Sequence, residues 1–174
     1  VRLRGVVSSV SGTDGYDLKA ASAQGVLVAH APTHANARGM AEAAVLLLLH
    51  LAYDMDGTRD DLRFGRPRPL PVRAQMLHGK RIGLVGWGRI SANLAALLQP
   101  WGVQLDVYSR RGTPADLPAH AHPVSLEALL SGSDFVCVLA GAEANMPPVI
   151  NRQGLALMKR SARLINLSRG AVVD

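Results

Sequence analysis

Short apolar runs alternate with helical patterns along most of the chain. Apolar runs bounded by Gly, Pro, Ser or Asp predict buried strands, and apolar residues that recur three or four positions apart predict helices between them. The predicted strands are residues 4–9, 26–29, 82–85, 103–108, 134–139 and 163–167, and the predicted helices are residues 17–24, 38–54, 90–99, 125–130 and 154–159. This alternation predicts an α/β fold of the Rossmann type, with a doubly wound parallel sheet.

The longest helical pattern has no polar face. Asn36 is the predicted N-cap of the helix at 38–54, and the apolar run at 43–49 predicts that this helix is buried between two layers. The run is too short to cross a bilayer. Residues 56–78 are polar, basic and rich in proline, so we expect an irregular surface connection there.

The strand at 82–85 leads directly into a glycine-rich turn and a new helix. In Gly86-Trp87-Gly88 the first glycine suits the tight turn, and the second lets a diphosphate approach the backbone. The helix directs the N–H groups of its first turn, those of Arg89 and Ile90 among them, at the same point. This order predicts a dinucleotide-binding site. Ser91 stands where a third glycine is usual, so we expect slight strain and weaker packing of the helix, with binding retained.

Composition and charge narrow the functional classes. The 174 residues include 19 Lys and Arg against 13 Asp and Glu, which gives a net charge of +6. The arginines are scattered and only 4% of residues are aromatic, so no base-stacking surface is visible and we expect no nucleic-acid partner. We expect most of the excess charge to be solvated and part of it to serve an anionic cofactor and substrate.

The thiol and imidazole groups predict neither a nucleophile nor a metal site. Cys137, the single cysteine, lies in an apolar strand and is expected to be a buried, inert thiol. His120 and His122 have the spacing of a metal pair without further ligands, so we expect them to be solvated and the chain to hold no metal. We expect no signal peptide, a cytoplasmic location and no membrane partner.

The two ends indicate a piece of a longer protein. The chain has no initiator Met, starts with the strand at 4–9, and stops at Val172-Val173-Asp174 inside a strand-to-helix connection. We therefore expect further sequence on both sides.

Four segments, in this order, resemble the D-isomer-specific 2-hydroxyacid dehydrogenase family. They are residues 11–18, 36–42, 78–90 and a last signature made up of 134–136, 158–159, 165–166 and 168–170. The resemblance implies a hinge near residues 32–36. Residues 1–33 are then the C-terminal part of a flavodoxin-like α/β substrate-binding domain, and residues 34–174 are most of a nucleotide-binding Rossmann domain.

The end of the second Rossmann strand indicates which dinucleotide binds. NAD enzymes of this type usually carry an acidic residue there, whereas the strand at 103–108 continues into Ser109, Arg110 and Arg111. These side chains suit a 2′-phosphate, and the pattern is similar to that of NADP-preferring hydroxypyruvate and glyoxylate reductases in the family. NADP is the expected cofactor, with NAD and a solvent-exposed arginine pair as the alternative. Asp106 is a second candidate for the ribose, although it lies inside the strand.

The resemblance also assigns roles around the substrate. Arg169 is the expected catalytic residue, which binds the substrate carboxylate and polarises the neighbouring carbonyl; the alternative is a structural arginine that caps a turn. Leu167 and Ser168 would line the nicotinamide side. Ser11 and Gly12 would offer a hydroxyl and backbone N–H groups to the cofactor or the substrate carboxylate, although a simple loop role suits them nearly as well.

Departures from the family pattern fall on the adenosine side. Leu139, Ala140 and Gly141 are expected to pass beside the adenosine, with Ala140 and Gly141 in contact with the cofactor. The family often has His and Pro where Leu139 and Gly141 stand, and Thr in place of Met146. None of these changes removes a group that transfers protons.

The function that the resemblance implies is hydride transfer between NAD(P)H and a small 2-keto or 2-hydroxy acid such as glyoxylate or hydroxypyruvate. The family's acid is a histidine oriented by a carboxylate, both beyond the Arg-Gly signature, and no histidine of this chain matches it. We therefore expect the chain alone to be inactive. The alternative is a non-catalytic, corepressor-like dinucleotide-binding protein.

Family members usually form dimers through the segment that holds the long helix, so a homodimer is expected.

Overall fold

The computed structural model describes residues 3–9, 12–13, 15–141 and 146–174. The chain divides into two compact units, Val1–Gly39 and Met40–Asp174. Among the described residues, no helix combines the length and the apolar character that crossing a bilayer requires.

The first unit contains one strand–helix–strand motif. Strands β1 (Gly5–Ser8) and β2 (Leu27–His30) pair in parallel, and α1 (Leu18–Ala23) connects them. Asp17 caps α1, since its carboxylate accepts the N–H of Ala20 at 2.9 Å. The predicted order of elements for this part of the chain is confirmed.

Helix α2 (His34–Ala52) begins earlier than predicted. The hydroxyl of Thr33 accepts the N–H of Asn36 at 3.0 Å, so Thr33 provides the cap and Asn36 lies inside the first turn. The prediction of Asn36 as the N-cap is therefore wrong. Thr33, which follows Pro32, supplies a capping oxygen three residues before the predicted position, so the helix begins earlier.

The buried face of α2 is a stripe rather than the whole circumference. Ala41, Ala44, Leu48 and Ala52 are fully or almost fully buried, at the spacing of one helix face. Leu46, on another side, is 66% exposed. Burial on all sides, which the apolar run predicted, is wrong for this chain because the sheet covers only one face of the helix.

A further helix follows where an irregular connection was expected. Helix α3 (Met55–Arg63) begins after Asp54, whose backbone is left-handed with φ +46°. The guanidinium of Arg73 binds the carboxylates of both Asp54 and Asp61 and so joins the return segment to α3. The prediction holds only for the part after α3, because a polar helix without a long apolar stripe gives a weak signal.

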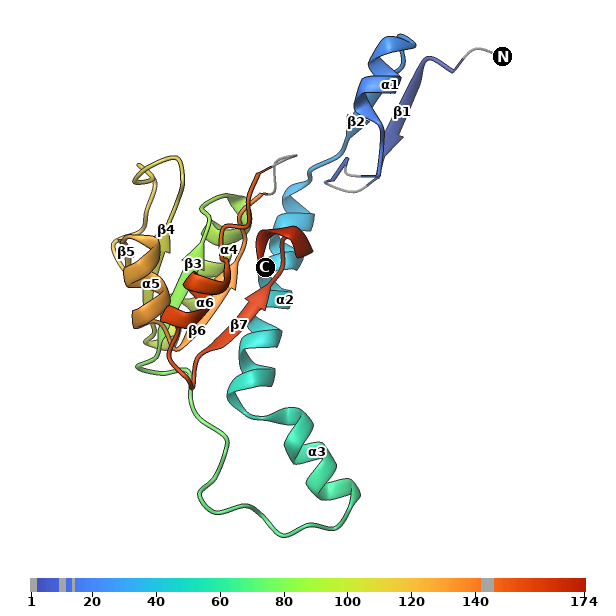
Figure 1. Ribbon diagram of the computed structural model, residues 1–174. Helices are drawn as coiled ribbons and strands as arrows, with labels where there is room; N and C mark the ends of the chain where they lie inside the picture. Colours follow the sequence, from blue (N-terminus) through green and yellow to red (C-terminus); the bar gives the residue numbers. More distant parts are fainter. Residues whose placement is uncertain (1–2, 10–11, 14, 142–145) are drawn as a thin grey trace. The chain divides into compact units, whose positions relative to one another are not determined.

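Within the described residues of the second unit, five strands form one parallel sheet, visible in Figure 1. The order across the sheet is β5-β4-β3-β6-β7, with β3 in the centre. The strands are β3 (Arg81–Val85), β4 (Gln104–Tyr108), β5 (Ala121–Pro123), β6 (Phe135–Val138) and β7 (Arg163–Asn166). Strand β5 lies where no strand was predicted, because its short, polar edge sequence carries no apolar run.

Helices cover both faces of this sheet. Their bounds are α4 (Arg89–Leu98), α5 (Leu126–Gly132) and α6 (Arg152–Leu157), with short 3-10 turns η1 (Gln99–Trp101) and η2 (Gly170–Val172). One core joins α2 and α4 to Ile82 and Leu84, and the other joins α5 to Val85 on the opposite face. Each fully buried aliphatic side chain stabilises such a core by about 1.5–3 kcal/mol. The doubly wound parallel sheet is confirmed.

The strand order reverses at β3, and this reversal positions the site. Going from β3 the chain forms β4 and β5 on one side, and then returns to form β6 and β7 on the other. At such a point neighbouring loops diverge and leave a crevice at the carboxyl ends of the strands. In this chain the crevice must open between the end of β3 and the end of β6.

Candidate functional site

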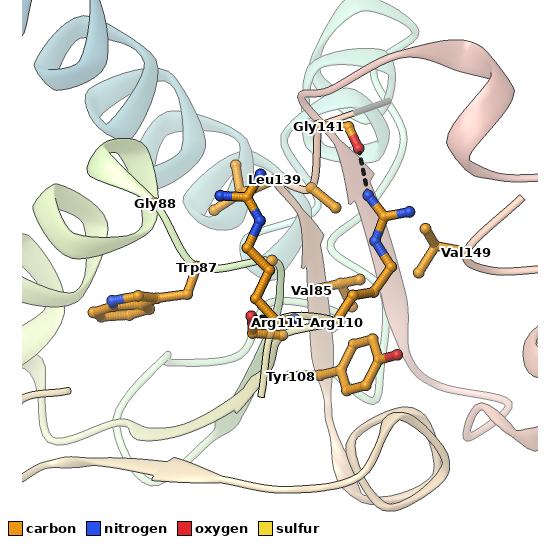
Figure 2. Close-up of a pocket in the computed structure, with 12 residues that line it drawn as sticks. Val85, Trp87, Gly88, Tyr108, Arg110, Arg111, Leu139, Gly141 and Val149 are labelled. Carbon is orange, nitrogen blue, oxygen red and sulfur yellow. Dashed lines mark hydrogen bonds between the residues drawn. The ribbon is translucent and has the colours of Figure 1, made fainter. Parts of the chain in front are cut away.

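A cavity of about 300 Å³ lies at this reversal of strand order (Figure 2). Its walls come from the turn between β3 and α4, the end of β4, the end of β6 and one residue of the following segment. The lining residues are Val85, Gly86, Trp87, Gly88, Tyr108, Ser109, Arg110, Arg111, Leu139, Ala140, Gly141 and Val149. Segments far apart in sequence therefore meet at one place.

Seven of the residues predicted to bind the cofactor line this cavity. They are Gly86, Gly88, Ser109, Arg110, Arg111, Ala140 and Gly141. Arg89 and Ile90 are the first two residues of α4, directly beside the turn. Leu167, Ser168 and Arg169 follow β7, at the same edge of the sheet as the cavity but outside its lining.

Gly86 is required by the fold itself. Its φ of +102° is a conformation that side chains rarely adopt, and a Cβ there would lie 2.6 Å from the backbone of Ala140. The N–H of Gly86 also donates to the carbonyl of Tyr108 at 2.8 Å. The glycine thus lets the turn after β3 lie directly against the end of β6.

Gly88 has a different environment. It is the N-cap of α4 with an extended φ of −165°, and apart from the residues adjacent in the chain no atom of the described residues lies within 4 Å of where its Cβ would be. No side chain caps the first turn of this helix. Open space and the backbone N–H groups of a helix's first turn therefore coincide at one place, which is the arrangement that accommodates a phosphate group.

Ser91 joins the helix to the turn. Its side chain is 1% exposed, and its hydroxyl donates to the carbonyl of Gly86 at 2.8 Å. The hydroxyl that stands in place of a third glycine is therefore buried with a hydrogen bond. Sequence reasoning considered only its size and missed this bond.

The two arginines after β4 stand at the mouth of the cavity. Figure 2 shows Arg110 extending to Gly141, whose carbonyl accepts from its guanidinium at 3.0 Å; another nitrogen lies 2.8 Å from the sulfur of Met146. The N–H of Arg111 donates to the hydroxyl of Ser109 at 3.2 Å. The end of β4 thus carries two positive charges and one hydroxyl next to the glycine turn.

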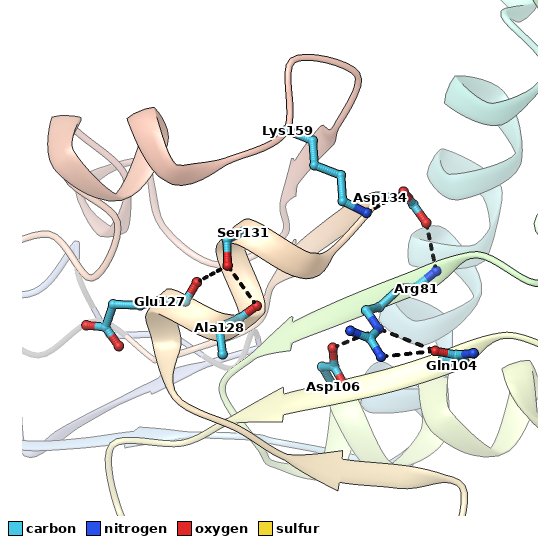
Figure 3. Close-up of polar contacts among 8 residues, drawn as sticks. All are labelled: Arg81, Gln104, Asp106, Glu127, Ala128, Ser131, Asp134 and Lys159. Atoms are coloured by element: carbon cyan, nitrogen blue, oxygen red, sulfur yellow. Dashed lines mark hydrogen bonds and ion pairs between the residues drawn. The ribbon is translucent and has the colours of Figure 1, made fainter.

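Asp106 lies away from the cavity, as part of a polar cluster shown in Figure 3. It is 5% exposed, and Arg81 lies 3.4 Å from its carboxylate. Arg81 also donates to Gln104 at 3.2 and 3.3 Å. The structure gives Asp106 a partner within the sheet, and a role for it at the ribose has no support in this geometry.

Asp134, before β6, joins three segments of the sheet. Its carboxylate accepts the N–H of Arg81 at 3.0 Å and an ammonium hydrogen of Lys159 at 2.9 Å (Figure 3). Partial burial alone would raise the pKa of Asp134, but these two donors outweigh burial and hold its pKa below the usual value. The carboxylate is therefore ionised and structural.

The turn after β7 presents Arg169. The side-chain carbonyl of Asn166 accepts the N–H and the hydroxyl of Ser168 at 3.0 and 2.7 Å, and its amide donates to the carbonyl of Arg169 at 2.9 Å. Leu167 extends the β6–β7 pairing by donating to Val138 at 3.1 Å. Arg169 is exposed on a turn whose backbone is fixed by one asparagine.

Burial and hydrogen bonds describe the surroundings of the remaining candidates. Cys137 is fully buried, which raises its pKa to about 12, so the prediction of an inert thiol is confirmed. The ring of His120 lies 3.1 Å from the carbonyl of Ala95, so it is bonded to protein rather than simply solvated. In the described part of the chain, no cluster of three His, Cys, Asp or Glu could hold a metal.

Ser11 lies outside the described residues, and the carbonyl of Gly12 accepts a hydrogen bond from the hydroxyl of Ser8 at 3.3 Å.

Comparison with known proteins decides the family. Residues 45–174 match the NAD binding domain of the D-isomer specific 2-hydroxyacid dehydrogenases. The chain belongs to this family. It is 32% identical over 172 residues to D-lactate dehydrogenase kk1H of Curvularia clavata, covering 99% of this chain and 49% of that protein. It is 33% identical over 184 residues to a glyoxylate reductase of Thermococcus litoralis, covering 99% of this chain and 54% of the relative.

Solved structures agree with this assignment. The NAD-dependent formate dehydrogenase of Staphylococcus aureus, solved in complex with NAD, superposes with a TM-score of 0.88 at 28% identity, covering 99% of this chain and 52% of that one. The chain spans about half the length of the relatives it matches.

Proposed function

We propose that this chain binds a nicotinamide dinucleotide in the cavity between β3 and β6, with the diphosphate at the N-terminus of α4. The observation that carries the proposal is the contrast between the two glycines. Gly86 is explained by contact with Ala140, whereas nothing among the described residues requires a glycine at Gly88. A ligand that approaches the backbone there supplies the missing reason.

The dinucleotide would supply the hydride, and the residues of the chain would bind and orient it. Gly86, Gly88, Arg89 and Ile90 would surround the diphosphate. Ala140 and Gly141 would flank the adenosine, and Leu167 and Ser168 the nicotinamide. The reaction would be the reduction of a small 2-keto acid or its reverse, as the names of the relatives suggest.

NADP is the cofactor that the end of β4 favours. No carboxylate stands at position 109 to repel a 2′-phosphate, and Arg110 and Arg111 add positive charge at the mouth of the cavity. Two groups that Arg110 contacts, the carbonyl of Gly141 and the sulfur of Met146, are neutral. A phosphate dianion is a stronger acceptor for a guanidinium than either of them.

Calorimetric titration of the chain with NADPH and NADH tests the cofactor assignment. We expect NADPH to bind roughly tenfold more tightly, because one charge-assisted bond contributes about 1.5–3 kcal/mol. Arg110→Ala should remove most of this preference, while Arg160→Ala, an exposed arginine outside the cavity, should leave it unchanged. Equal affinities that neither variant alters would contradict NADP as the cofactor, and the absence of binding would contradict the proposed function.

Arg169 would bind the substrate carboxylate and polarise its carbonyl. A guanidinium is always charged and forms paired bonds with a carboxylate, and the turn held by Asn166 gives it a fixed backbone. In a form of the protein that reduces glyoxylate or hydroxypyruvate, Arg169→Lys should lower kcat/KM by roughly a hundredfold or more. A change of less than threefold would favour the alternative role of capping a turn.

Other expectations stay predictions. They concern the division of the chain at residues 33 and 34, substrate contacts of Ser11 and Gly12, a homodimer, a cytoplasmic location and inactivity of the chain alone. Turnover by the protein would also decide against the non-catalytic, corepressor-like alternative.

A further inference from the structure

The segment after β4 carries the two cavity arginines and is attached to the domain at several points. Leu117 packs against the core between α2, α4 and the sheet. The ring of His120 lies 3.1 Å from the carbonyl of Ala95 on α4. Arg110 and Arg111 come earlier in the segment, so their placement depends on what holds its first half.

A hydrogen bond between side chains holds that half. The indole N–H of Trp87 donates to the carboxylate of Asp116 at 2.8 Å, across 29 residues of sequence. Trp87 lies between the two glycines of the turn, and its ring packs against the core of the domain. Figure 2 shows the ring pointing away from Arg110 and Arg111. The indole ring is thus directed away from the two arginines, and its N–H holds the segment that follows β4.

We propose that Trp87 and Asp116 are positioning residues that set cofactor selectivity in the site proposed above. The bond joins the turn that would receive the diphosphate to the segment that bears the arginines. It thereby fixes the separation between diphosphate and ribose subsites, since Asp116 is only five residues from Arg111. This inference rests on the proposed function, because selectivity presupposes that a dinucleotide binds.

Three variants test the bond by calorimetry with NADPH and NADH. Asp116→Ala removes the acceptor and should weaken NADPH about five- to tenfold, while NADH changes less than twofold. Trp87→Phe keeps an aromatic ring without the donor and should have the same effect. Asp116→Asn keeps an oxygen that can accept from the indole and should stay within about twofold of the unchanged chain. A merely structural role would affect both cofactors alike.

Coupling to the arginine gives the second readout. In the Arg110→Ala background, Asp116→Ala should have almost no further effect on NADPH, because the group it positions is gone. The inference is overturned if Asp116→Ala leaves NADPH affinity unchanged, weakens both cofactors equally, or acts fully in the Arg110→Ala background. It is also overturned if Asp116→Asn loses as much as Asp116→Ala. Failure of the unchanged chain to bind either cofactor would instead reject the proposed function.

Discussion

At the scale of single residues, the two glycines of the turn after β3 are explained by different requirements. Gly86 is required by the fold, because its φ is positive and it lies close to the backbone of Ala140. Gly88 satisfies no packing requirement that the described residues make. The two positions therefore form a matched pair, in which one substitution measures folding and the other measures binding.

Gly86→Ala should destabilise the domain by roughly 2–4 kcal/mol, from backbone strain and from overlap with Ala140. Gly88→Ala should change the free energy of unfolding by less than about 1 kcal/mol, since its φ is extended and its surroundings are open. Urea unfolding of both variants measures these changes. Calorimetry should show that Gly88→Ala nevertheless weakens dinucleotide binding at least tenfold; retained affinity would contradict a phosphate at this turn.

The sequence predicted which residues line the cavity, but it did not predict the hydrogen bonds that hold them in place. The glycine turn and Arg110 are visible because their spacing from a strand end is fixed by the Rossmann pattern. The bonds of Ser91 to Gly86 and of Trp87 to Asp116 depend on the exact course of a turn and of an irregular segment. No local pattern encodes those positions, so only the structure shows them.

At the scale of elements, the amino end of the sheet is held by ionic and hydrogen-bonded contacts. Asp134 connects the start of β6 to the first residue of β3 and to Lys159 before β7. This end lies opposite the cavity, since all strands run in parallel. The contact therefore acts on stability and leaves the binding edge free.

Lys159→Met should lower stability by about 0.5–1 kcal/mol at pH 7, a modest value because both side chains are partly exposed to solvent. The folded-state pKa of Asp134 lies below its unfolded value, so its contribution is present above the unfolded pKa and is lost as the pH falls through the folded pKa. Urea unfolding at pH 7 and near pH 3 should show the difference between the two proteins shrinking in acid. A difference that grows in acid would contradict this assignment.

Elements with strong periodicity were predicted well, and weak ones were missed. The central strands and α5 follow directly from apolar runs. Helix α3 and strand β5 have polar, partly exposed sequences, and their structure depends on partners such as Arg73 and β4. Tertiary contacts decide such segments, and the sequence does not display those contacts.

At the scale of the whole molecule, the exposed apolar side chains of the second unit are unevenly distributed. Several lie in the segment at 53–76, which we call the arm. Leu62 is 79% exposed and Leu70 is 87% exposed, and an apolar cavity of about 430 Å³ lies between α3 and the return segment. Soluble monomers rarely leave such surfaces uncovered, which favours the homodimer that the family resemblance implies.

Sedimentation of the chain should give twice the monomer mass of 18.4 kDa. Leu62→Glu should shift the equilibrium toward monomer, because a charge at the centre of an apolar contact is costly to bury. Leu157→Glu, on α6 and 46% exposed, is the matched control and should leave the mass unchanged. A chain that sediments as a monomer, or that responds equally to both substitutions, would contradict an interface at the arm.

The central claim is that a dinucleotide binds where α4 begins. The most direct test is a titration of the chain with NADPH, followed in the two-dimensional amide NMR spectrum. We predict the largest shifts at the amides of Gly86, Gly88, Arg89 and Ile90, whose N–H groups lie in the turn and the first turn of α4. Unchanged signals at these four amides, with or without shifts elsewhere in the chain, would contradict the account.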